Sequence, residues 1–360
     1  MEPRDLNRMF DRLAPTADQE QAVLDRLLQT ERKGKPMGKL KKLTVVAIAA
    51  ALMVISCAAA VVMGLDQRLI DYFGAGPEQA ELLAPGAVPV DVTVKDNGAE
   101  FHVSQVLMDQ HFLLVLAEFT APEGVTLDNK GDPFLLFGDF TLDFLNANRE
   151  PYAEDDLSGW AFTIRCLDDK DPADNHMTVL LELRLDSGVD CQKAAFFRLS
   201  FTDFGWFDTD ILEFVSLRSG TWSCDIPLPQ TEIGQTHEVN IPVGEIDGVN
   251  ISMKSYYLSP MTLQITLERE IPIDFYGDNE AVRHRWQSAV GGTERVSLTS
   301  RDGMKIPLRG KGGGSGLQEQ EQLYRLEEIT ALSQFQGGTL NIRIEDGSVD
   351  VPLDGLVPAG

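Results

Sequence analysis

Cysteine, histidine and basic residues are scarce in this chain of 360 residues. Four Cys are too few for a disulfide-stapled fold, and the five His are scattered, with no pair at metal-ligand spacing. Only 31 Lys and Arg stand against 56 Asp and Glu, which gives a formal net charge of −25. Nucleic acid is therefore disfavoured as a partner, because binding to phosphates needs clustered basic residues.

Motifs for catalysis are also missing. No Ser lies in a Gly-x-Ser-x-Gly turn, which exposes the nucleophile in many hydrolases. The acidic stretch 168–175 lacks the Gly at position six and the Glu at position twelve of an EF-hand calcium loop. The Gly-rich stretch 311–316 lacks the spacing of a phosphate-binding loop. We expect both stretches to be solvated loops, and we expect no enzyme, no cofactor and no metal site.

One segment has no charge at all. Residues 43–64 contain no Asp, Glu, Lys or Arg. As a helix, these 22 residues would be about 33 Å long, which matches a hydrocarbon core of about 30 Å. Residues 1–42 before it carry 10 basic against 7 acidic side chains, and residues 65–360 after it carry 21 against 49. Because basic flanks stay inside, the sequence predicts a single-pass cell-membrane protein with a cytoplasmic N-terminus.

A different reading of the same segment exists. The stretch 54–57, Val-Ile-Ser-Cys, fits the consensus for processing of bacterial lipoproteins, and translation from Met37 would give it a signal-like start. The long N-terminal extension and the apolar residues that continue to Leu65 favour a retained membrane helix with Cys57 inside it. Cleavage or lipidation at Cys57 is left undecided by the sequence.

The cytoplasmic segment reads as a short helical hairpin. Apolar side chains recur at helical spacing on both sides of the break at Ala14-Pro15, and Thr16 begins a capping-box pattern for the second helix. The apolar side chains on each helix are too few to form a core of their own. The hairpin must therefore dock on a partner protein or lie on the inner leaflet of the membrane. The candidate partner-binding residues are Leu6, Met9, Phe10, Leu13, Val23, Leu24, Leu27 and Leu28.

The remaining residues predict mainly β structure. Residues 65–83 look helical, and short β-branched or aromatic runs with Gly/Asp turns, such as Asn97-Gly98, follow to the end. This spacing favours two extracytoplasmic β-sandwich-like domains, residues 65–217 and 218–360, with one helical interruption at 317–332. The tryptophans are expected in the cores. We expect Cys166, Cys191 and Cys224 to be unpaired thiols, although a disulfide between two of them is not excluded.

Several segments resemble one known family. These are 71–74 (Asp-Tyr-Phe-Gly), 92–107, 220–222 (Gly-Thr-Trp) and 258–263 (Leu-Ser-Pro-Met-Thr-Leu). They are similar to poorly characterised membrane-anchored proteins of Gram-positive bacteria, described as anti-sigma-factor-like and often encoded beside extracytoplasmic-function sigma factors. The resemblance covers residues 40–130 well and 218–355 more loosely.

The resemblance implies a function in signal transduction. By implication, the cytoplasmic hairpin would bind a sigma factor, and the outer domains, the second of them immunoglobulin-like, would sense the state of the envelope. One departure is that residues 1–42 contain neither His nor Cys, so the zinc-binding pattern of many anti-sigma domains is absent. The alternative is a membrane-anchored surface module that binds an envelope component or a protein and has no role in transcription.

Overall fold

The computed structural model describes residues 64–353 with several gaps. The gaps are 128–133, 152–159, 168–170, 172–173, 186–188, 191–192, 209–212, 275–279, 291–294, 309, 313–317, 327–334, 336 and 346. The described chain is mainly β and contains several sheets, as the sequence predicts. In the part of the chain that is described, no helix is long and apolar enough to cross a membrane. The expected membrane segment and cytoplasmic hairpin lie outside this part, except for Gly64.

Two short helices begin the described chain, where a helical piece is expected. α4 (Gln67–Phe73) is capped by Asp66, whose carboxylate accepts a hydrogen bond from the amide of Arg68 at 2.8 Å. Gly74 ends the helix in the left-handed conformation, at φ 60°. α5 (Pro77–Leu83) starts with Pro at its first turn, where the missing amide costs no hydrogen bond, and the 3₁₀ turn η1 (Ala84–Gly86) follows.

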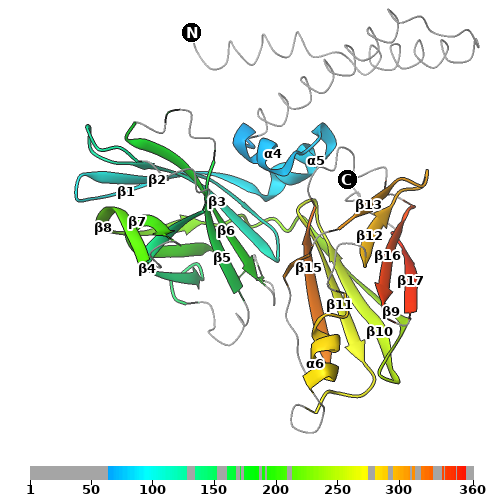
Figure 1. Cartoon of the computed structure of the whole chain (residues 1–360). Coiled ribbons are helices and arrows are strands. Elements are labelled where there is room, and N and C mark those ends of the chain that lie inside the picture. Colours follow the sequence, from blue (N-terminus) through cyan, green and yellow to red (C-terminus); the bar gives the residue numbers. More distant parts are fainter. Residues whose placement is uncertain are drawn as a thin grey trace, which may run out of the picture. The chain divides into compact units, whose positions relative to one another are not determined.

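The first module is one sheet of eight antiparallel strands in the order β1-β2-β3-β6-β5-β4-β7-β8. The sheet curls, so that the edge strands β1 and β8 approach each other: Asn97 Nδ2 donates to Ser219 O at 2.9 Å, and Thr221 N donates to Asp96 at 2.7 Å. Figure 1 shows these strands in cyan to green. The strands are β1 (Ala87–Asp96), β2 (Ala99–Met108), β3 (Phe112–Thr120), β4 (Phe134–Leu145), β5 (Trp160–Cys166), β6 (His176–Leu185), β7 (Phe196–Asp208) and β8 (Glu213–Pro227).

An aromatic core fills the curled sheet. Phe119 stacks on Phe204 with ring centroids 4.3 Å apart, and Trp222 lies edge-on to Phe119 at 5.2 Å. All three side chains are buried. Trp222 therefore belongs to the first module, and β8 pairs with β7 as far as Pro227, so the strand continues through the domain boundary expected at 217/218.

The second module has two sheets that enclose a common core. One sheet has the order β14-β15-β11-β10-β9 and the other β13-β12-β16-β17, and the core takes Ile265 from the first and Leu340 from the second. Trp286, from α6 (Glu280–Gln287), is buried in the same core. The strands are β9 (Gln235–Ile246), β10 (Val249–Leu258), β11 (Thr262–Arg269), β12 (Val296–Thr299), β13 (Lys305–Pro307), β14 (Gly310–Gly312), β15 (Glu319–Arg325), β16 (Thr339–Ile344) and β17 (Gly347–Pro352).

The prediction of a helix at 317–332 is wrong for the part of this range that the structure describes. Residues 319–325 form β15, which pairs with β11 along its length. The Gln- and Glu-rich sequence favours a helix, but Tyr324 is buried in the core, and the ladder with β11 decides the conformation. The helix α6 was not anticipated.

The two modules repeat one four-stranded pattern. His102 on β2 pairs with Glu118 on β3. The residues 150 positions later in the sequence, Ser252 on β10 and Glu268 on β11, pair in the same way. The same register shift occurs at 103/105 and at 253/255. The turns before these hairpins also match, because Asn97 and Asp247 adopt φ 47° and 54° and a Gly with positive φ follows each. The strands β1-β2-β3-β6 thus correspond to β9-β10-β11-β15.

Candidate functional site

Two equivalent hairpin turns meet where the modules join. In the β2–β3 turn, Asp109 Oδ1 accepts hydrogen bonds from the amides of His111 and Phe112, both at 2.8 Å. In the β10–β11 turn, Ser259 Oγ accepts from the amides of Met261 and Thr262, both at 2.9 Å. Asp109 and Ser259 hold corresponding positions in the repeat, so each module presents the same capped turn to the other.

Asp109 joins the two turns. Its second oxygen, Oδ2, accepts hydrogen bonds from Ser259 Oγ and from Thr262 Oγ1, the latter at 2.6 Å. The side chain is buried, and burial raises the pKa of Asp109, while the hydrogen bonds from Ser259, Thr262 and the turn amides oppose this rise. Two backbone amides and two hydroxyl groups, from both modules, therefore surround the carboxyl group.

The helices α4 and α5 pack into the same junction, which we call the seam. Gln79 Nε2 on α5 donates to the carbonyls of Pro260 and Leu326, at 2.8 and 3.1 Å. Arg325 lies over the ring of Tyr72 on α4, 4.5 Å from its centroid, and its Nη1 is 3.2 Å from Glu182 Oε2. One apolar cluster joins all parts of the seam: Leu69, Phe73 and Leu83 from the helices, Leu114 and Leu116 from the first module, and Met261 and Leu323 from the second.

The first described residue is anchored to this structure. Gln105 on β2 is buried, and its Nε2 donates to the carbonyl of Gly64. Its Oε1 accepts from the amide of Asp66 at 2.7 Å. The chain that leaves residue 64 is therefore attached directly to β2.

A charged cluster fixes α4 on the outer face of the first module. Arg68 donates to Glu118 Oε1 on β3 at 2.9 Å, and His102 and His176 each place a ring nitrogen 3.7 Å from Glu118 Oε2. Burial alone would raise the pKa of Glu118, but the hydrogen bond and the charge of Arg68 bring it below its usual value. Asp66, the cap of α4, shares the same guanidinium.

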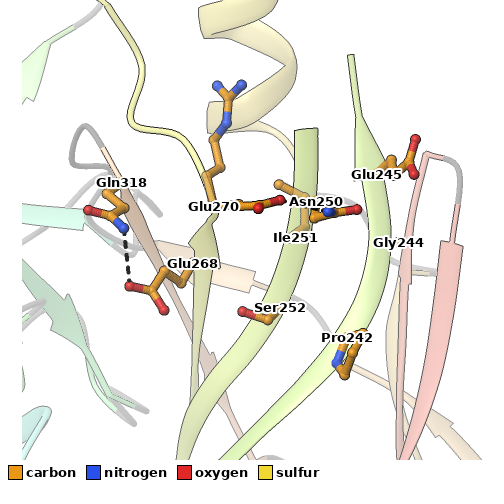
Figure 2. A pocket seen from close by; sticks show the side chains of 10 residues that line it. Pro242, Gly244, Glu245, Asn250, Ile251, Ser252, Glu268, Glu270 and Gln318 are labelled. Carbon is orange, nitrogen blue, oxygen red and sulfur yellow. Dashed lines mark hydrogen bonds between the residues drawn. The ribbon is translucent and has the colours of Figure 1, made fainter. Parts of the chain in front are cut away.

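The second module has a pocket of about 630 Å³ on the outer face of its five-stranded sheet (Figure 2). Carboxylates line it, from Glu245 on β9, Glu268 on β11 and Glu270 just beyond β11. Asn250 and Gln318 add amide groups, and Arg269, whose guanidinium lies over the ring of Trp286, also belongs to the lining. The lining thus combines carboxylates, amides and one arginine, and it can form hydrogen bonds and ion pairs with a polar ligand.

No group of three or more His, Cys, Asp or Glu in the described ranges could hold a metal ion. Cys166 and Cys224 are thiols in the structure, and burial raises the pKa of Cys224 to about 12, so this thiol is unreactive at neutral pH. Cys191 lies outside the described residues.

The candidate partner-binding residues of the N-terminal hairpin all lie outside the described part of the chain. The seam and the pocket were not anticipated. Their residues are ordinary in type, and only the repeat spacing of 150 residues relates Asp109 to Ser259 and Glu118 to Glu268.

Comparisons with known proteins assign no family to this chain. No protein-family model matches it, and no curated protein does. A solved structure of a conserved domain protein from Bacillus anthracis is similar over 72% of this chain and 80% of its own, with 14% identity and a TM-score of 0.43. Bovine butyrophilin is 8% identical over 69% of this chain and 93% of its own, with a TM-score of 0.16.

Proposed function

We propose that this chain is a single-pass membrane regulator that resembles an anti-sigma factor. Residues 43–64 cross the cell membrane, and the hairpin in residues 1–42 binds an extracytoplasmic-function sigma factor in the cytosol. The two β modules lie outside as sandwich-like domains, the second of them immunoglobulin-like, and respond to the state of the envelope. No catalysis and no cofactor are involved.

The attachment of the chain at residue 64 carries this proposal. Gln105 hydrogen-bonds to Gly64 and Asp66, and α4 and α5 pack against both modules in the seam. A ligand that rearranged the seam would therefore displace the chain just beyond the membrane segment. A flexible tether at this point would transmit no such change.

Deletion of residues 1–36 from the full chain in its native cells tests the sigma-binding step. We expect transcription from the promoters that depend on the sigma factor encoded nearby to rise, because the deleted segment no longer binds that sigma factor. A sharper variant is Leu27→Asp, which places a charge in the apolar stripe, with Gln29→Asp as the matched control. Leu27→Asp should reduce co-purification of the sigma factor from membranes at least tenfold, while Gln29→Asp should not. Unchanged transcription after the deletion, with no co-purifying sigma factor, contradicts the proposal.

The acidic pocket favours a second candidate function. A surface module that binds a protein or an envelope component needs a recess with exposed polar groups, and the second module has one. In that case residues 1–42 lie on the inner leaflet, and the deletion leaves transcription unchanged.

A further inference from the structure

The turn between β1 and β2 carries the one Asn-Gly sequence of the chain, Asn97-Gly98. Asparagine is chemically labile, and a following Gly, which has no Cβ, lets the next backbone nitrogen approach the side-chain carbon Cγ. Both residues are exposed, and Asn97 adopts φ 47°. Among the described residues, the amide of Gly98 donates no hydrogen bond. The nitrogen that can attack the Asn97 side chain is therefore not held by the fold.

An arginine from β8 lies against this turn. Arg218 donates a hydrogen bond from Nη2 to the backbone carbonyl oxygen of Asn97. This oxygen and the Gly98 nitrogen belong to the same peptide bond, so loss of the Gly98 proton places negative charge on both atoms. A guanidinium at the oxygen stabilises that charge, as preorganised donors do in an oxyanion hole. Nε of Arg218 is buried and has no hydrogen-bond partner, so a further donor is available beside the turn.

The repeat shows what an acidic side chain does at this position. Asp247 corresponds to Asn97 and adopts a similar φ, 54°. Its carboxylate is bound by the guanidinium of Arg285 on α6, whose Nε lies 3.2 Å from Oδ2. The second module thus carries in the same turn the side chain that loss of the Asn97 amide produces, together with an arginine that binds it. Arg218 offers a guanidinium beside the first turn.

We propose that Asn97 is a site of spontaneous deamidation and that Arg218 promotes the reaction. Base removes the proton of the Gly98 amide, and the nitrogen attacks Cγ of Asn97, so that an N–Cγ bond forms. The Cγ–Nδ2 bond breaks, and ammonia leaves with a proton taken from water. Water then opens the succinimide ring at either carbonyl and gives aspartate or isoaspartate.

The modification changes the contact that closes β1 against β8. The hydrogen bond from Asn97 Nδ2 to Ser219 O is lost, because the product has no amide group to donate it. The new carboxylate pairs instead with Arg218, as Asp247 pairs with Arg285 in the second module. This chemistry is independent of sigma-factor binding by residues 1–42.

Incubation of the full chain in detergent micelles at mildly alkaline pH, followed by peptide mapping with mass spectrometry, tests this site. The mass of the peptide with Asn97 should rise by the difference between an amide and a carboxyl group, and the rate should increase with pH. Asn240 is the internal control, because it is exposed and has a similar φ, 51°. It should keep its amide on the same time scale, because the branched side chain of Ile241 hinders attack by the following nitrogen.

Variants of Arg218 separate promotion from a merely structural role. Arg218→Gln should slow deamidation about fivefold, and Arg218→Lys, which keeps the charge, should restore part of the rate. Lys95→Gln removes another positive charge near the turn, one bound to Glu100 at 2.5 Å, and should leave the rate unchanged. In concentrated urea, where the turn is not formed, Arg218→Gln and wild type should react at the same rate.

A clamp that only fixes the turn would act in the opposite direction, because removal of Arg218 would free the side chain and speed the reaction. The proposal is overturned if Asn97 keeps its amide in the native chain while the chain in urea loses it. It is also overturned if Arg218→Gln reacts as fast as wild type or faster, or if Lys95→Gln slows the reaction as much. If circular dichroism shows that Arg218→Gln does not fold, Arg218→Lys decides, and a rate equal to or above that of the wild type is the contradicting result.

Discussion

At Asp109 one carboxylate receives hydrogen bonds from both modules. Two come from the amides of its own turn and two from the hydroxyls of Ser259 and Thr262. The side chain is 1% exposed, so water cannot replace these partners. The residue thus ties the β2–β3 turn to the β10–β11 turn at a point where loss of the carboxylate leaves donors buried and unpaired.

Asp109→Ala should lower the free energy of unfolding by about 2–4 kcal/mol, because it leaves buried donors without an acceptor. Asp139→Ala removes an exposed carboxylate from β4 and should change stability by less than about 0.5 kcal/mol. Urea denaturation followed by tryptophan fluorescence measures both. Equal stability of the two variants would show that Asp109 does not support the seam.

The helix α4 is fixed to the sheet by electrostatic contacts as well as by apolar packing. Arg68 connects Asp66 and Glu118, and the rings of His102 and His176 flank the Glu118 carboxylate. Glu118 is partly exposed, so water weakens the pair, and its contribution to stability is at most about 1 kcal/mol.

The docking of α4 should depend on pH through Glu118. Its pKa in the folded chain is lowered, so its contribution is complete above the unfolded value of about 4.3 and is lost as pH falls through the folded value. We expect Glu118→Gln to lower the melting temperature at pH 7 but to match the wild type near pH 3. The matched control, Glu123→Gln, changes an exposed loop residue and should show no such convergence. A constant difference between Glu118→Gln and wild type at all pH values contradicts the account.

Local chemistry made several elements predictable. Asn97-Gly98 requires positive φ at both residues and forms the expected turn, and the apolar residues around Gly74 form the expected helical piece. The strand at 319–325 was missed because its Gln- and Glu-rich sequence favours a helix, and only its pairing with β11 shows otherwise. The domain boundary that the sequence predicts at 217/218 falls inside β8, because this strand continues to Pro227 in its pairing with β7.

The seam and the pocket depend on contacts between distant parts of the sequence. Asp109 and Ser259 are 150 residues apart, and neither residue type marks a site by itself. The repeated turns at 97–98 and 247–248, each followed eleven residues later by a capping side chain, were the one available signal. The register of two hairpins was needed to recognise it. The N-terminal binding residues stay a prediction.

At the scale of the described chain, both modules and the helices share one apolar cluster. We therefore expect residues 64–360 to unfold in a single cooperative transition, because neither module can separate without exposing the seam. Differential scanning calorimetry should give one heat-absorption peak for the wild type. Two well-separated peaks in the wild type would mean that the modules are independent.

Hydrogen exchange of the full chain in lipid nanodiscs tests the coupling through the seam most directly. Amides of α5 and of the β10–β11 turn should exchange slowly in the wild type, and Asp109→Ala should accelerate both segments together, because the seam opens as one unit. Asp139→Ala should accelerate neither. If α5 exchanges fast in the wild type, or if Asp109→Ala affects the turn and leaves α5 unchanged, the chain beyond the membrane segment is not coupled to the second module, and the proposed route of signalling is wrong.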